Sequence, residues 1–287
     1  TEADFEKVDW TSMEIAMKRI RQTLLRTRVV QWQHGWLPLG RQQHRIDSER
    51  SNLCPICHES EETQSHFLVC PHSSCRANVL IQMAIYHRSL QKKKILGAVW
   101  TQIKQRILFE LGHLPRCPPY PEVAQDDRIG RHLQLAILDQ ASIGWINFIK
   151  GRISQHWGKA QGIYYSEAFP ESKTLTAQTF QLALISGAWA FFHGIWEHRN
   201  NTLHDNITNV NIDGMNRRIL QVYRNPEEYV RSSSLCLFDA FTQDECISLH
   251  PTIKRTWLQT IYLAIKAKHG DLKCLETNTQ TSITDFF

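Results

Sequence analysis

The sequence predicts a mainly α-helical protein with a small zinc-knuckle-like module and a disordered C-terminal tail. Three observations support this fold class. Apolar residues recur every three or four positions over long stretches, strand-like alternation is scarce, and four of the eight cysteines cluster within residues 54–75. Hydrophobic residues make up 42% of the 287 residues and charged residues 21%, so we expect a real core and exclude global disorder.

Helical spacing of apolar residues places the main elements. A first apolar stripe, made of Met13, Met17, Ile20 and Leu24, predicts a helix over about 12–33. Gly35 and Pro38 end this helix. A second stripe predicts a helix over 94–111, and the prolines after it mark a linker near 113–123. Further helical stretches are expected at 128–157, 176–204, 212–224 and 252–268.

Charge and composition divide the chain into four predicted segments. These are a basic helical segment at 1–50, a zinc module at 51–80, a helical domain at 81–270 and a polar tail at 271–287. The formal net charge is +5, yet residues 18–50 alone carry eight Lys and Arg against two acidic residues. The longest uncharged apolar run, Leu182–Phe192, is much shorter than the about 20 residues of a membrane-spanning helix, so no membrane partner is expected.

Four residues form a metal-ligand pattern of the type C-x2-C-x8-H-x3-C: Cys54, Cys57, His66 and Cys70. A CxxC turn and an H-x3-C pair at a helix start can together fill the four tetrahedral positions that Zn²⁺ prefers. Since no position is left for water, the predicted zinc site is structural. His58, His72 and Cys75 are possible substitute ligands, and the alternative is a set of free or core cysteines beside a solvated histidine.

The order of motifs around this pattern resembles a known family. Trp36-Leu37-Pro38, a basic stretch, the CxxC pair, Glu61-Glu62-Thr63, His66 and Cys70-Pro71 are similar to the zinc-binding region downstream of the polymerase in LINE-type (non-LTR) retrotransposon reverse transcriptases. A less specific likeness continues to about residue 205, through Trp157, Gln161, Trp189, Trp196, Arg199-Asn200 and His204.

This resemblance implies a piece of a polyprotein that copies its RNA into a nicked chromosomal target, in which the zinc module helps to grip nucleic acid. The chain begins with Thr1 rather than Met, as expected of such a piece. It lacks the Tyr-x-Asp-Asp of a polymerase, an RNase H carboxylate series and a Pro-Asp…Glu-x-Lys endonuclease pattern. We therefore expect an accessory region that is not itself an enzyme and takes no small-molecule substrate.

The basic segment is the candidate nucleic-acid surface, because arginines neutralise phosphates and aromatic faces stack on unpaired bases. Its candidate contacts are Arg19, Arg21, Arg26, Arg28, Arg41 and Arg45. Trp36 is a candidate stacking residue, whereas Trp32 shares an apolar stripe with Val29 and is expected in the core. The alternative is an ordinary solvated helix face. Glu62 is expected to face away from nucleic acid or to cap a helix.

A second polar group lies on one helix face, since Trp196, Arg199, Asn200 and His204 follow at i, i+3, i+4 and i+8. It could bind a phosphate or a partner helix. We favour the simpler interpretation, in which Trp196 packs in the core while Arg199 and Asn200 tie down a neighbouring loop.

The chain ends in a peptide that resembles the PCNA-interacting (PIP) box, Q-x-x-[ILM]-x-x-[FY]-[FY], at Gln280, Ile283, Phe286 and Phe287. The three apolar residues lie at i, i+3 and i+4, so a single helical turn gathers them into one hydrophobic plug. Gln280 adds an amide that can both donate and accept a hydrogen bond. The resemblance implies docking on the PCNA sliding clamp and a nuclear location.

The sequence is consistent with three functions. The first is a nucleic-acid-binding accessory region of a retrotransposon reverse transcriptase that is tethered to PCNA. The second is a domesticated or host adaptor that docks proteins on the clamp without a polymerase. The third is a nuclease with an unrecognised site, which a pocket of converging carboxylates would support. The expected partner of the basic segment is RNA or DNA.

Overall fold

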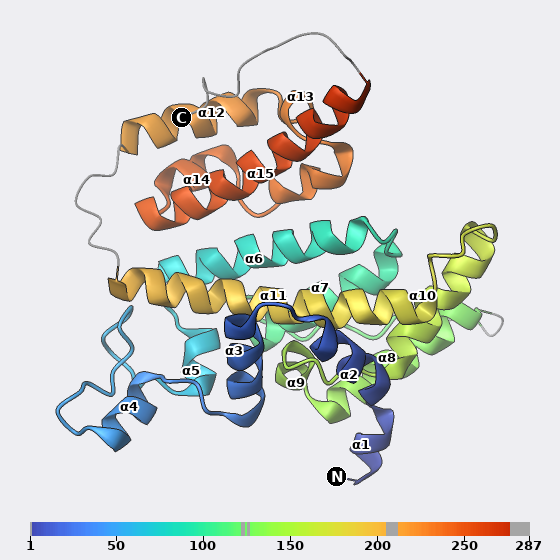
Figure 1. The fold of residues 1–287 in the computed structure, drawn as a ribbon, viewed down its shortest axis with the longest axis horizontal. Coiled ribbons are helices and arrows are strands. Elements are labelled where there is room, and N and C mark those ends of the chain that lie inside the picture. Colours follow the sequence, from blue (N-terminus) through green and yellow to red (C-terminus); the bar gives the residue numbers. More distant parts are fainter. Residues whose placement is uncertain (1, 122–123, 125–126, 205–211, 276–287) are drawn as a thin grey trace. The chain divides into compact units, whose positions relative to one another are not determined.

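The computed structural model describes residues 2–121, 124, 127–204 and 212–275. Within these residues the protein is helical, and its β-structure is limited to two isolated bridges, Val8–Ser154 and Leu53–Glu61. The mainly α fold class is therefore confirmed. The chain forms two compact units, Thr1–Asn206 and Ile207–Phe287, which we describe separately (Figure 1).

Helices α1 to α11 belong to the first unit. Their bounds are α1 Glu2–Lys7, α2 Trp10–Arg19, α3 Thr23–His34, α4 Gly40–Ile46, α5 Gln64–Val69, α6 Ser73–Gln91, α7 Gly97–Glu110, α8 Arg128–Ile143, α9 Trp145–Ile149, α10 Gln155–Ala168 and α11 Ala177–His204. The long helix α11 is the centre of this unit, since α2, α3, α6, α9 and α10 all pack against it (Figure 1). Its buried aromatic residues include Phe180, Trp189, Phe192 and Trp196.

Two glycines let α6 approach α11 closely. A Cβ atom at Gly187 would lie 2.2 Å from the ring of Tyr86, and one at Gly194 would lie 2.1 Å from Oε1 of Gln82. The Tyr86 hydroxyl also donates a hydrogen bond to the carbonyl of Leu184, 2.7 Å away. The contact between these helices therefore depends on residues without side chains at two points.

The helix predicted over 12–33 is wrong in one respect, because the structure contains two helices there. The backbone leaves the helix at Ile20, where it is extended (φ −70°, ψ 106°), and α3 begins at Thr23. Leu24, predicted on the core stripe, is 78% exposed. The break lets α2 and α3 each lay an apolar face on α11, which one straight helix could not do.

Glycines interrupt the helix predicted over 128–157. Gly144 (φ +98°) separates α8 from α9, and Gly151 (φ +89°) follows α9, both in a conformation that favours glycine. A Cβ atom at Gly151 would also lie 2.6 Å from Nε1 of Trp189.

The helix predicted over 94–111 is close to the observed α7, although α7 begins at Gly97. The amide of Gln161 bonds the backbone of Lys94 and Leu96 just before it.

The Pro-rich segment near 113–123 lies inside the first unit. The guanidinium of Arg106, which is 2% exposed, donates to the carbonyls of Pro118 and Pro119 at 3.1 and 3.2 Å. It also lies over the Tyr120 ring, 4.8 Å from the centroid. The division between the two units falls at residues 206 and 207.

The second unit contains α12 Ile212–Arg224, α13 Pro226–Tyr229, a 3₁₀ helix at Ser232–Leu237, α14 Gln243–Ser248 and α15 Pro251–Leu275. Tyr223 stacks on Trp257 with the ring centroids 5.3 Å apart, and Phe238 packs edge-on against both. The predicted helix over 212–224 matches α12. Helix α15 extends to residue 275, so the first residues of the predicted tail are helical, and 276–287 lie outside the described residues.

Candidate metal centre and the neighbouring basic segment

A short hairpin presents the first two cysteines. The amide of Cys54 donates to the carbonyl of Ser60 at 2.8 Å, next to the Leu53–Glu61 bridge. The amide of His58 donates to the carbonyl of Cys54 at 2.9 Å, and His58 has a left-handed backbone (φ 57°). This tight turn brings Cys54 and Cys57 to one edge of the hairpin.

Helix α5 and the residue after it present the other two candidate ligands, His66 and Cys70. The Thr63 side chain caps it by accepting from the amide of His66 at 3.0 Å, and Cys70 follows its last residue, Val69. His66 and Cys70 are four positions apart, so they lie one turn apart on the same face. The cap at Thr63 therefore fixes the start of the turn that aims His66 at the cysteines.

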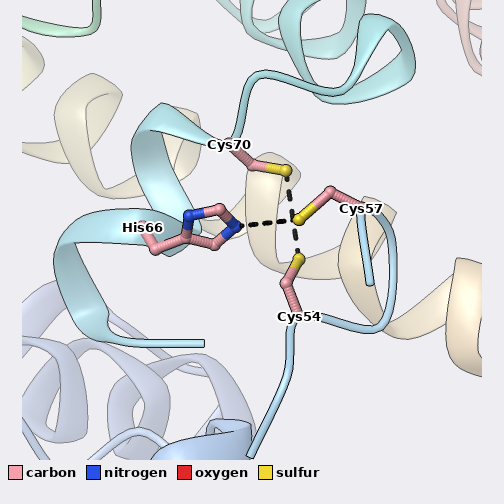
Figure 2. Close-up of side chains that lie close together, drawn as sticks. All are labelled: Cys54, Cys57, His66 and Cys70. Carbon is pink, nitrogen blue, oxygen red and sulfur yellow. Dashed lines mark hydrogen bonds between the residues drawn. The ribbon is translucent and has the colours of Figure 1, made fainter. Parts of the chain in front are cut away.

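The four predicted ligands converge (Figure 2). The sulfur and nitrogen atoms of Cys54, Cys57, His66 and Cys70 all lie within 4.8 Å of one another, and this group could hold a metal ion. The Cys54 and Cys70 sulfurs are 3.9 Å apart, and the Cys57 sulfur is 3.4 Å from Nε2 of His66. Two thiolates at about 2.3 Å from a tetrahedral zinc ion are about 3.8 Å apart, so the spacing fits.

The three substitute ligands lie outside this group. His58 and His72 are exposed, and the ring of His72 accepts a hydrogen bond from the amide of Ser74 at the start of α6. Cys75 is partly buried and interacts with the thiol of Cys70. The ligand set that the spacing predicts is thus the set that the fold brings together.

Two of the three thiols, those of Cys54 and Cys70, have a raised pKa. The hydrogen bond with Cys70 and burial raise the pKa of Cys54 to about 12. For Cys70, the hydrogen bond with Cys54 lowers the pKa, but Cys75 and burial outweigh it and raise the pKa to about 12. Because metals bind thiolates, a metal ion must displace these protons, and its affinity must weaken as the pH falls.

A buried ion pair joins the metal centre to α11. Nε and Nη2 of Arg199 donate to Oε1 and Oε2 of Glu62, each at 2.8 Å, and the two residues are 7% and 1% exposed. Thr63 caps α5, so the helix whose first amide Glu62 binds is α4. Oε2 also accepts from the amide of Gly40, the first residue of α4, at 2.5 Å.

The simpler interpretation of the polar helix face is confirmed for Trp196 and Arg199, but no loop contact is seen for Asn200 within the described residues. Trp196 is 4% exposed, and Arg199 holds the loop that contains Glu62. Asn200 accepts a hydrogen bond from Nη1 of Arg199 at 3.1 Å. The side chain of His204 lies outside the described residues. This face is therefore occupied by contacts within the unit.

The two tryptophans of the basic segment have different environments. Trp32 is 1% exposed and stacks on Phe192 of α11 with centroids 5.0 Å apart, so its predicted core position is confirmed. Trp36 is 62% exposed, and one face stacks on His34 at 5.0 Å. An exposed tryptophan supported on one side leaves its other face open to a ligand.

Most of the candidate arginines are exposed. Arg19 and Arg21 flank the break between α2 and α3, Arg26 lies on α3, and Arg45 lies on α4; none of their side chains has a hydrogen bond or ion pair with a described residue. Arg41 makes one loose pair with Glu61, at 3.7 Å. Arg28 differs, because its guanidinium lies over the Trp196 ring at 5.1 Å and donates to Gln31.

One residue near the candidate metal centre, His198, was not singled out by the sequence analysis. His198 on α11 is 5% exposed, and neither ring nitrogen has a hydrogen-bond partner among the described residues. Burial lowers its pKa to about 4. Its sequence neighbours, Glu197 and Arg199, give no hint that the ring is buried beside the cysteines.

Comparison with known proteins adds no relative. No family model matches the chain, and neither a curated protein nor a solved structure matches it. Within the described residues, no helix combines the length and apolar character that crossing a membrane requires. The PIP-like residues Gln280, Ile283, Phe286 and Phe287 lie outside the described residues.

Proposed function

We propose that this chain is a non-catalytic accessory region of a retrotransposon reverse transcriptase. It binds single-stranded nucleic acid through the basic segment 18–50, which a structural zinc ion helps to order. It docks on PCNA through residues 280–287, and it acts in the nucleus. The clamp-binding part rests on the sequence pattern alone.

The observation that carries the nucleic-acid proposal is that one segment combines the exposed Trp36 with arginines whose side chains have no partner among the described residues. Stacking of an unpaired base on an aromatic side chain contributes about 1–3 kcal/mol and tolerates any base. Arginines without protein partners are free to neutralise phosphates. A solvated helix face needs no such tryptophan, so the combination favours binding of a single strand.

Zinc is the metal that best fits the donor set. Three thiolates and one imidazole at tetrahedral spacing match a Cys₃His structural site, and softer or harder metals favour other ligands or geometries. All four positions belong to the protein, so the ion has no open position for a substrate. Its contribution is to hold the hairpin and α5 together.

Hydrogen bonds of Glu62 connect the candidate metal centre to the helix that carries two of the basic residues. Glu62 lies between the hairpin and α5. Its carboxylate accepts hydrogen bonds from the backbone amide of Gly40 and from the guanidinium of Arg199. A Cβ atom at Gly40 would lie 2.9 Å from the carbonyl oxygen of Asn52, so α4 starts tightly against the module. Helix α4 carries Arg41 and Arg45, so ordering the module also orders their backbone.

The test is the salt dependence of binding to a labelled single-stranded oligonucleotide, measured by fluorescence anisotropy. Each phosphate contact contributes about −0.7 to the slope of log affinity against log salt for a single strand. Arg19→Glu with Arg21→Glu and Arg45→Glu should weaken binding and flatten that slope by about 2. The matched control reverses three exposed lysines that follow α6, Lys92, Lys93 and Lys94. Equal losses in both variants would place the interface elsewhere.

A further inference from the structure

The buried ring of His198 is a feature of the first unit that its packing leaves unexplained, since both of its nitrogens lack a partner in the described part of the chain. A neutral imidazole carries one N–H donor and one acceptor nitrogen. Both nitrogens of His198 are fully buried and have no hydrogen-bond partner among the described residues. Because buried polar groups in native proteins are paired, this ring indicates a partner that belongs to the folded, metal-loaded protein.

The surroundings of the ring identify that partner. His198 lines a small cavity of about 10 Å³ together with Cys54, Cys70 and Cys75, among apolar side chains. Such a volume holds about one water molecule. Glu62 and Arg199 also line it, but they already bond each other through both carboxylate oxygens. The cysteine sulfurs are the polar atoms that remain.

The cavity faces one side of the metal centre. Cys54 and Cys70 line it, whereas Cys57 and His66 do not. His198 is not itself one of the residues whose ligand atoms lie within 4.8 Å of one another. A zinc ion with three thiolates leaves a net negative charge in this buried place, and donors outside the ligand shell stabilise such charge and fix the orientation of the ligands.

We propose that His198 is a positioning residue of the metal centre. It donates its N–H, through a water molecule held in this cavity, to the metal-bound thiolates of Cys54 and Cys70. This role rests on the proposed zinc site and is independent of nucleic-acid binding. It also couples α11, which carries Trp196 and Arg199, to the loading of the module.

The test is zinc affinity, measured by competition with a chromophoric chelator. His198→Leu should bind zinc about 10- to 100-fold more weakly, the usual effect of losing such a donor. His198→Gln keeps an N–H donor and should stay within about threefold of wild type. The matched control is His193→Leu on the same helix, whose partly exposed ring lies 3.5 Å from Glu197 and does not line the cavity; it should bind zinc as wild type does.

Two further readouts separate positioning from other roles. The Co²⁺ spectrum of His198→Leu should keep the thiolate charge-transfer bands of wild type, because no ligand is removed; an altered spectrum would make His198 a ligand and overturn the proposal. The metal-free variant should be at least as stable as metal-free wild type, since an unpaired polar ring is removed. Unchanged zinc affinity with lower metal-free stability would make His198 merely structural.

The wild-type protein supplies a test that needs no variant to fold. The ring nitrogens of His198, observed by long-range ¹H–¹⁵N NMR, should shift when zinc is added, and the absence of a shift contradicts the proposal. Wild type that binds no zinc would overturn the metal site and this inference together. Wild type that binds zinc, with an insensitive His198→Leu, would overturn this inference alone.

Discussion

Loss of the buried Glu62–Arg199 ion pair should lower the free energy of unfolding more than any other predicted change. Replacing Arg199 by Met keeps much of the side-chain volume but leaves the Glu62 carboxylate, which is 1% exposed, without its countercharge. Removing one partner of a buried, doubly hydrogen-bonded pair costs about 3–5 kcal/mol. Both contacts are 2.8 Å long, so the full range applies here. For a unit of this size that loss lowers the melting temperature by roughly 6–20 °C.

The assay is urea unfolding of the metal-loaded protein, followed by tryptophan fluorescence and by circular dichroism. The matched control is Arg41→Met, because Arg41 and Glu61 form an exposed pair at 3.7 Å. Exposed pairs contribute about 0–1 kcal/mol, so this control should unfold close to wild type. The double variant Glu62→Met, Arg199→Met should regain part of the stability, since no charge is left buried alone.

Two results would refute this reasoning. If Arg199→Met unfolded at the same urea concentration as Arg41→Met, the pair would not be buried in solution. If the double variant were less stable than Arg199→Met, the unpaired charge would not be the source of the loss.

The remaining predictions concern the metal, the tail and pH. The purified protein should contain about one zinc per chain, and Cys54→Ser with Cys57→Ser should abolish it in metal analysis; unchanged content contradicts the site. A peptide of residues 274–287 should bind PCNA in a calorimetric titration at about micromolar affinity, and no heat at tens of micromolar peptide would refute it. In the whole chain, Phe286→Ala with Phe287→Ala should remove PCNA binding and leave the zinc content unchanged. Burial and Arg76 lower the pKa of His113 from 6.5 to about 4, so its contribution to stability is complete above pH 6.5 and is lost as the pH falls towards 4. Urea midpoints at pH 7 and pH 5, measured for wild type and His113→Gln, check this prediction. An equal pH dependence of the two proteins would contradict it.

Local sequence signals predicted the elements that depend on local physics. The four candidate metal ligands are close in sequence, and their spacing alone restricts the geometry, so the pattern identified the group that the fold brings together. Helices α11 and α12 were predicted with nearly their observed bounds because apolar spacing continues through each. By contrast, no glycine or proline marks the break at Ile20, which arises from packing on α11.

Contacts between distant segments could not be predicted in this way. Helix α6 was not assigned from the sequence, because it buries residues around most of its circumference, including the polar Asn78 and Gln82, and so has no single apolar stripe. Glu62 and Arg199 are 137 positions apart, and both lie in motifs that the sequence singled out. Periodicity gives the face of a side chain but not its partner on another element.

Replacement of Trp36 tests the central claim most directly. In a fluorescence anisotropy titration with a single-stranded oligonucleotide, Trp36→Ala should bind about 5- to 150-fold more weakly than wild type, the loss expected for one stacked base. Trp36→Phe should retain most of the affinity, and Leu24→Ala, which changes a side chain that is 78% exposed on α3, should bind as wild type. Because Trp36 is 62% exposed, its loss should leave the urea midpoint unchanged. Affinity equal to wild type for Trp36→Ala would contradict the account, since the basic segment would then present no stacking surface to nucleic acid.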